Sequence, residues 1–156
     1  MNWPVLIGFK LSWFALVLYQ DLLLIPVLLF LIWSLWRSAP AERLAWLMLA
    51  VAGISMDSLL QYSGVLSFTG SGWLPFWMVV LWLVFSQVLV QVFSRFLENY
   101  WVAALSAAVS GPLAYLGGAA LSGQMQVSQT TEAYVALALC WALYGVLSGW
   151  SRKFYA

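Results

Sequence analysis

Asp57 is the residue in this 156-residue chain whose type and position most favour chemistry. It lies inside an apolar stretch, and on a helix it would share a stripe about 80° wide with Gly53, Gln61 and Gly64. A carboxyl group at membrane depth is costly unless it faces protein or water. Two interpretations remain open: a ligand-binding or proton-coupling carboxylate, or a neutral or paired aspartate that forms hydrogen bonds to neighbouring helices.

Lys10 lies near the middle of another apolar stretch and is a possible counter-charge for Asp57. The long lysine stem can cover several ångströms of helix rise, so a Lys10–Asp57 pair is one hypothesis. In the alternative, Lys10 extends its ammonium group to the lipid headgroups on the nearer side of the membrane.

A second polar face runs along the fourth apolar stretch. Its members fall within about 100° on a helix; they are Gln87, Gln91, Ser94, Arg95 and Glu98. One interpretation is one wall of a cavity open to the cytoplasm, where Arg95 would meet an anionic headgroup. We favour the other, in which Gln87 and Gln91 form hydrogen bonds between helices and Arg95 pairs with Glu98 in solvent.

Histidine is absent from the sequence, and Cys140 is the single cysteine. These two facts exclude Ser-His-Asp and Cys-His catalysis and the usual zinc and haem ligand sets. Cys140 lies in an apolar run, where a thiol packs as a small hydrophobic side chain. We expect no metal and no cofactor. An intramembrane enzyme ranks last among the function classes, because no nucleophile–base pair is recognisable.

Apolar stretches must position these polar residues. Hydrophobic residues make up 65% of the chain and charged residues 7%, with a mean hydropathy of +0.95, which excludes a water-soluble globule. We expect one integral membrane domain over residues 1–156: an all-α, compact bundle of six transmembrane helices near 3–19, 22–36, 44–63, 74–93, 100–121 and 133–150. The clusters at 67–72 and 122–131 have ordinary loop composition.

The length of the first apolar stretch predicts a turn between two helices at Gln20-Asp21. A single helix over residues 3–36 would measure about 50 Å, whereas the hydrocarbon core is about 30 Å thick. Two short spans that turn at this point fit better, and five spans are the alternative.

The charges predict an orientation. In the six-span arrangement Asp21 and Glu132 fall on one side of the membrane, and the basic residues fall on the other; these are Arg37, Arg43, Arg95, Arg152 and Lys153. Basic residues near span ends stay in the cytoplasm, so both termini should be cytoplasmic. Tryptophans near the predicted span ends are expected to be interfacial anchors; these are Trp3, Trp33, Trp36, Trp73, Trp77, Trp101 and Trp150. A net charge of +1 without a basic patch argues against nucleic acid.

Small residues mark two of the predicted helices for close approach. Ala103, Ala107 and Gly111 begin a small-residue seam on the fifth stretch, and Gly145 and Gly149 form a G-x-x-x-G pair on the sixth. These helices either pack against each other or use one seam for a homo-oligomer contact. On the fifth stretch, Pro112 predicts a kink.

Four groups of residues together resemble a known family. They are Gly8-Phe9 with Trp13-Phe14; 56–60 with Gly64 and Phe68; 75–77 with 81–85; and 111–115 with Gly118. The pattern is similar to the bacterial inner-membrane proteins grouped as domain of unknown function 2878. The resemblance implies a compact multi-pass protein of the bacterial inner membrane, a link to lipid metabolism, and Asp57, Trp82, Gly111, Pro112 and Tyr115 as positions to test.

Two functions compete at this stage. The first is a protein that binds or transports a lipid or a small amphipathic solute. Its candidate ligand-binding residues are Asp57, Gln61, Gln87, Gln91, Tyr115, Lys10 and Arg95. The second is a non-catalytic partner or scaffold for another membrane protein, such as a lipid-modifying enzyme or a transporter complex. Membrane lipids are the expected surroundings in both cases.

Overall fold

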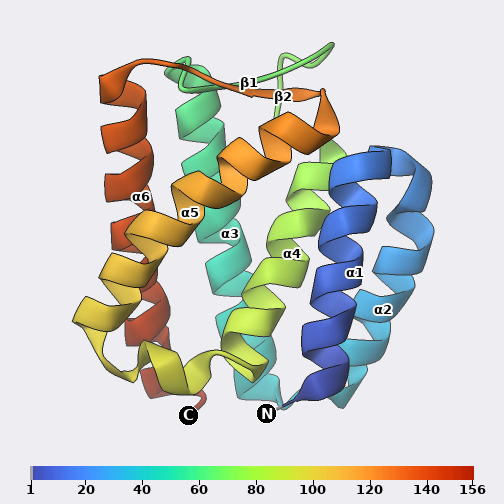
Figure 1. Cartoon of the computed structure of the whole chain (residues 1–156). Helices are drawn as coiled ribbons and strands as arrows, with labels where there is room; N and C mark the ends of the chain where they lie inside the picture. The colour runs from blue at the N-terminus through green and yellow to red at the C-terminus, as the bar shows by residue number, and fades with distance from the viewer. Residues whose placement is uncertain (1) are drawn as a thin grey trace.

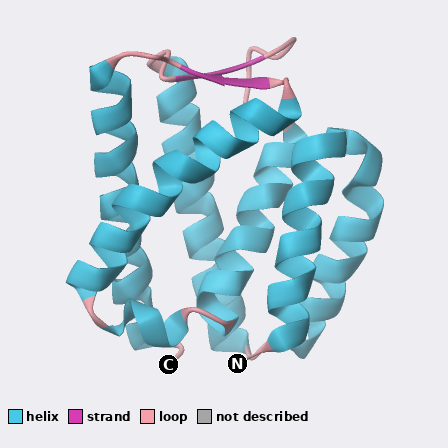
Figure 2. Cartoon of the chain, viewed as in Figure 1, coloured by secondary structure: helices cyan, strands magenta, loops and turns pink. Residues whose placement is uncertain are grey.

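Helices build most of the described chain, which comprises residues 2–156 of a computed structural model (Figures 1 and 2). The elements follow in the order α1 (Trp3–Tyr19), η1 (Gln20–Leu23), α2 (Leu24–Arg37), α3 (Pro40–Tyr62), β1 (Leu66–Phe68), α4 (Phe76–Gln91), η2 (Ser94–Glu98), α5 (Tyr100–Ser122), β2 (Met125–Val127), α6 (Thr131–Ser151) and η3 (Arg152–Phe154). The predicted all-α class is confirmed.

Four continuous helical stretches among the described residues are long and apolar enough to cross a membrane. They are Trp3–Arg37, Pro40–Tyr62, Tyr100–Ser122 and Thr131–Phe154, and Phe76–Gln91 is a shorter apolar helix. Large apolar side chains also cover much of the outer surface, for example Leu22, Leu29, Leu105 and Leu143. A water-soluble protein rarely exposes so much contiguous apolar surface, so this exterior matches lipid tails better than water.

The first of these stretches turns back on itself at the predicted position. Gln20 has a φ of 45°, and its side-chain amide donates to the carbonyl of Val17 at 2.9 Å. A Cβ atom placed on Gly8 would overlap the ring of Phe30. Figure 1 accordingly shows α1 and α2 side by side, joined by a turn at η1.

A short two-stranded ribbon crosses one end of the bundle, where the sequence predicted only loops (Figure 2). Strands β1 and β2 pair antiparallel, with Leu66 opposite Val127 and Phe68 opposite Met125. All four of these side chains are buried, whereas the middle residue of each strand is exposed. This alternation covers the end of the core with apolar side chains. The two chain termini lie at the opposite end (Figure 1).

The small-residue seam holds α5 against α6 within the chain. A Cβ atom on Gly145 would lie 2.5 Å from the carbonyl oxygen of Ala103 and 3.0 Å from the Cβ of Ala107. Glycine is needed here because the neighbouring atoms belong to a helix backbone that cannot turn aside. The helix continues through Pro112.

The Gly145→Ala variant should therefore unfold more readily than the native protein, by about 1–3 kcal/mol, because the added methyl group forces α5 and α6 apart. Gly117→Ala is the matched control, since a Cβ atom there has no neighbour within 4 Å and removing a helical glycine stabilises by about 0.5–1 kcal/mol. Unfolding of both variants in detergent micelles measures the difference. Equal stability of the two would contradict this packing.

Candidate functional site

Asp57 is fully buried inside the bundle, with an exposed fraction of 0%. Its Oδ2 accepts a hydrogen bond from the indole Nε1 of Trp82 at 2.7 Å, and its Oδ1 accepts one from the hydroxyl of Tyr115. The three residues come from α3, α4 and α5. The carboxyl group therefore connects three helices inside the bundle and has a donor for each oxygen atom.

Glycines one turn away make room for the indole rings that surround this carboxyl group. A Cβ atom on Gly53 would overlap the ring of Trp82, and one on Gly111 would overlap the ring of Trp141. Gly53 precedes Asp57 by four residues and Gly111 precedes Tyr115 by four, so each glycine lies beside the polar residue of its own helix. The stripe of small and polar residues around Asp57 therefore accommodates the ring of Trp82.

An aromatic cluster encloses the buried carboxyl group. Trp82 stacks on Trp141 with ring centroids 5.5 Å apart and an interplanar angle of 24°. Trp141 also packs edge to face against Tyr115 at 5.8 Å and against Phe85 at 5.5 Å. Such offset and edge-on pairs fix ring positions more firmly than aliphatic contacts.

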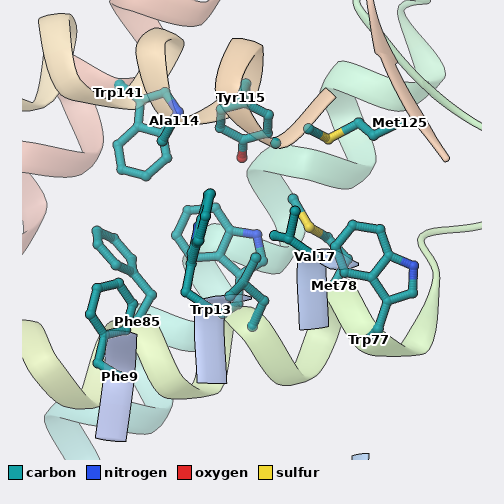
Figure 3. Close-up of a pocket in the computed structure, with 13 residues that line it drawn as sticks. Phe9, Trp13, Val17, Trp77, Met78, Phe85, Ala114, Tyr115, Met125 and Trp141 are labelled. Carbon is teal, nitrogen blue, oxygen red and sulfur yellow. The ribbon is translucent and has the colours of Figure 1, made fainter. Parts of the chain in front are cut away.

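A cavity of about 100 Å³ lies against this cluster, between α1, α4, α5 and α6 and next to β2 (Figure 3). Its walls are apolar and mainly aromatic; the aromatic members include Phe9, Trp13, Trp77, Phe85, Tyr115 and Trp141. In Figure 3 the hydroxyl oxygen of Tyr115 points into the open space between the two rows of side chains. At about 100 Å³ the cavity is smaller than the engineered apolar cavity of about 150 Å³ that binds benzene, so it suits a small group such as the end of a chain.

The cavity reaches the outer surface of the bundle beside α1 and α5. Its wall includes Ala114, which is exposed, and Phe9 and Trp13, which are half-buried. The neighbouring surface residue Leu113 is a large apolar side chain, exposed by 62%. The opening therefore lies in the apolar part of the surface.

Residues 2–147 match the family described as protein of unknown function DUF2878. The chain belongs to this family. The matched segment contains Asp57, both of its donors and every residue of the cavity wall. No curated protein and no solved structure matches the chain.

In this DUF2878 protein, Gln87 and Gln91 join α4 to α2. The side-chain amide of Gln87 donates to the hydroxyl of Ser34, and that of Gln91 donates to the hydroxyl of Ser38 at 2.5 Å. The Ser34 hydroxyl in turn lies 3.4 Å from Oε1 of Gln91. These contacts match the interpretation of the two glutamines as hydrogen-bonding residues between helices.

The polar pocket expected from the sequence is not the cavity of this DUF2878 protein. Of Asp57, Gln61, Gln87, Gln91 and Tyr115, Tyr115 alone lines it, and Asp57 lies behind the side chains of Trp82 and Tyr115. Gln61 is half-buried. Asp57 and Gln87 are fully buried, but both form hydrogen bonds to other helices and line no cavity.

The Lys10–Asp57 hypothesis and the favoured Arg95–Glu98 pair are both wrong. Lys10 is exposed on α1, so it forms no pair with the fully buried Asp57. Arg95 is exposed in η2, and the partner of Glu98 is Arg152, with an N–O distance of 3.0 Å. The bundle brings η3 beside η2, and this tertiary contact replaces the local i,i+3 pair. No three metal-ligating side chains gather within residues 2–156.

The sequence did not lead us to expect the aromatic walls, since seven of its tryptophans were explained as interfacial anchors. Trp77 was among those anchors, yet it is 4% exposed and lines the cavity. A usable signal was present, since Trp13, Trp82 and Trp141 lie in the middle of apolar stretches, where interfacial anchoring does not explain them.

A double-mutant cycle tests the Asp57–Tyr115 hydrogen bond. Asp57→Leu should destabilise the protein by about 2–5 kcal/mol, because it leaves two buried donors without an acceptor. Tyr115→Phe should then cost less in the Asp57→Leu background than in the native protein, since its partner is already absent. Unfolding free energies of the four proteins measure this coupling; strictly additive effects would show that the two side chains do not interact.

Proposed function

We propose that this protein is a multi-pass protein of the bacterial inner membrane that binds or transports a lipid or a small amphipathic solute. The observation that carries the proposal is the aromatic cavity, which opens on the apolar surface and has in its wall Tyr115, whose hydroxyl donates to Asp57. Small-molecule sites are typically apolar clefts with a few well-placed polar groups, and this cavity has that composition.

The position of the opening favours a ligand that arrives from the bilayer. Exposed Ala114 lies at the opening, and the apolar side chain of Leu113 is beside it. A water-soluble solute would have to cross hydrocarbon to reach this point, whereas a lipid tail already lies there. The hydroxyl of Tyr115 then offers a polar contact at the inner end of an otherwise apolar site.

We further propose that all of α1 to α6 cross the membrane, with both termini in the cytoplasm. The 16-residue α4 is short, at about 24 Å, but its central residues Val80 and Val84 are fully buried by other helices. The end of the bundle that carries both termini also carries η2 and η3 with their basic residues (Figure 1). Basic residues near span ends favour the cytoplasmic side.

Cysteine accessibility tests this orientation. In a Cys140→Ala background, Thr69→Cys should react with a membrane-impermeant maleimide added to intact spheroplasts. Ala41→Cys and Ala156→Cys should react only after the membrane is opened, because they lie at the cytoplasmic end. Labelling of Ala156→Cys in intact spheroplasts would show that the orientation is the opposite of the one proposed.

Blocking the opening tests the binding site. Ala114→Trp should place a bulky ring at the opening and remove a lipid that co-purifies with the native protein, with at least a ten-fold loss in its mass-spectrometric signal. Leu113→Trp, one residue away on the exposed surface, is the matched control and should retain the lipid.

The same preparations distinguish the alternative function. A lipid bound equally to both variants would place binding outside the cavity. A companion protein that co-purifies with the native chain, and also with Asp57→Asn, would instead support a role as a non-catalytic partner of a membrane enzyme or transporter.

A further inference from the structure

The cavity wall carries one hydrogen-bond donor that has no partner. The indole Nε1 of Trp141 is buried and has no hydrogen-bond partner in the described part of the chain. Trp141 itself is 7% exposed and lines the cavity. A buried donor without an acceptor is costly, so a ligand that supplies an acceptor here gains affinity.

The neighbouring polar group, the hydroxyl of Tyr115, is a hydrogen-bond acceptor for a ligand. Tyr115 donates its hydroxyl proton to Asp57, so its oxygen is left with acceptor capacity alone. The Tyr115 and Trp141 rings are adjacent, with centroids 5.8 Å apart. The donor of Trp141 and the acceptor of Tyr115 therefore belong to neighbouring rings of the same cavity wall.

Trp141 cannot easily turn its N–H group elsewhere. Its ring is stacked on Trp82 at 5.5 Å, and it lies so close to Gly111 that a Cβ atom there would overlap it. The donor is consequently held in place before any ligand arrives, which limits the entropy lost on binding.

We propose that the cavity binds the hydroxyl end of a lipid alcohol, and this inference rests on the proposed function. A hydroxyl group accepts the hydrogen bond of Trp141 Nε1 and donates its own proton to the Tyr115 oxygen. Ethers and carbonyls only accept, and an alkyl group does neither. A carboxylate would bring a negative charge next to the Asp57 carboxyl group in a site of low dielectric. The alkyl chain of the alcohol leaves the cavity beside Ala114 and joins the surrounding lipid.

Three probes of equal heavy-atom count test the inference on the full-length protein in nanodiscs. Decan-1-ol and its isomer methyl nonyl ether differ in the donor proton, and undecane lacks the oxygen atom. The readout is the probe concentration, per lipid, that gives half-maximal thermal stabilisation. Decan-1-ol should bind about three- to ten-fold more tightly than the ether, and the ether more tightly than undecane, as expected for one neutral hydrogen bond at each step.

Trp141→Phe keeps an aromatic ring but removes the donor. In this variant the ether should lose its advantage over undecane, whereas the affinity for undecane should change by less than about two-fold. Trp73→Phe, in an exposed loop position, is the control and should leave all three affinities unchanged. Should Trp141→Phe not fold, the comparison of the three probes with the native protein decides the question.

The possible failures are distinguishable. If undecane, ether and alcohol all bind with equal affinity, the hydroxyl preference is refuted while the apolar binding site stands. If none of the three stabilises the protein at saturating concentration, the proposed function falls together with this inference. An ether preference that survives in Trp141→Phe would assign the contact to another group and overturn the role of Trp141.

Discussion

The need to satisfy a carboxyl group in the middle of an apolar helix bundle constrains this structure more than any other feature. Asp57 has no exposed surface, so both of its oxygens depend on donors from other helices. Trp82 and Tyr115 supply them. Because these donors belong to α4 and α5, the position of three helices is fixed by one acidic side chain, and the rings that carry the donors must lie against it.

Those rings in turn explain the glycines. Helices in lipid gain little from the hydrophobic effect, so close packing contributes most of the attraction between them. Gly53 and Gly111 each receive the face of an indole ring, which lets bulky tryptophans lie between helices that remain close. Gly145 serves a different purpose, since it brings the α6 backbone against the carbonyl of Ala103. The indole rings and the glycines opposite them thus form complementary surfaces.

The same complementarity leaves a space beside the cluster. Rigid rings fill a bundle less evenly than flexible aliphatic chains, and the cavity between α1, α4, α5 and α6 is bounded by such rings. Two polar groups in its wall differ in their hydrogen bonding. The Tyr115 hydroxyl donates to the Asp57 carboxyl group, whereas the Trp141 N–H group has no acceptor. A site with fixed polar atoms in apolar surroundings discriminates ligands by hydrogen bonding more sharply than by shape.

The sequence by itself determined the all-α class, the helical stretches, the turn at Gln20-Asp21 and the burial of Asp57, because hydropathy and helix length act locally along the chain. It also indicated that Gln87 and Gln91 connect helices. It did not determine which charged groups would meet: Glu98 had Arg95 three residues away, but the fold brought Arg152 to it. Nor did it show that Trp77, Trp82 and Trp141 would gather from two helices around one cavity. Those outcomes depend on how the helices pack and rotate, which residues far apart in the chain decide together, so only the tertiary structure could reveal them.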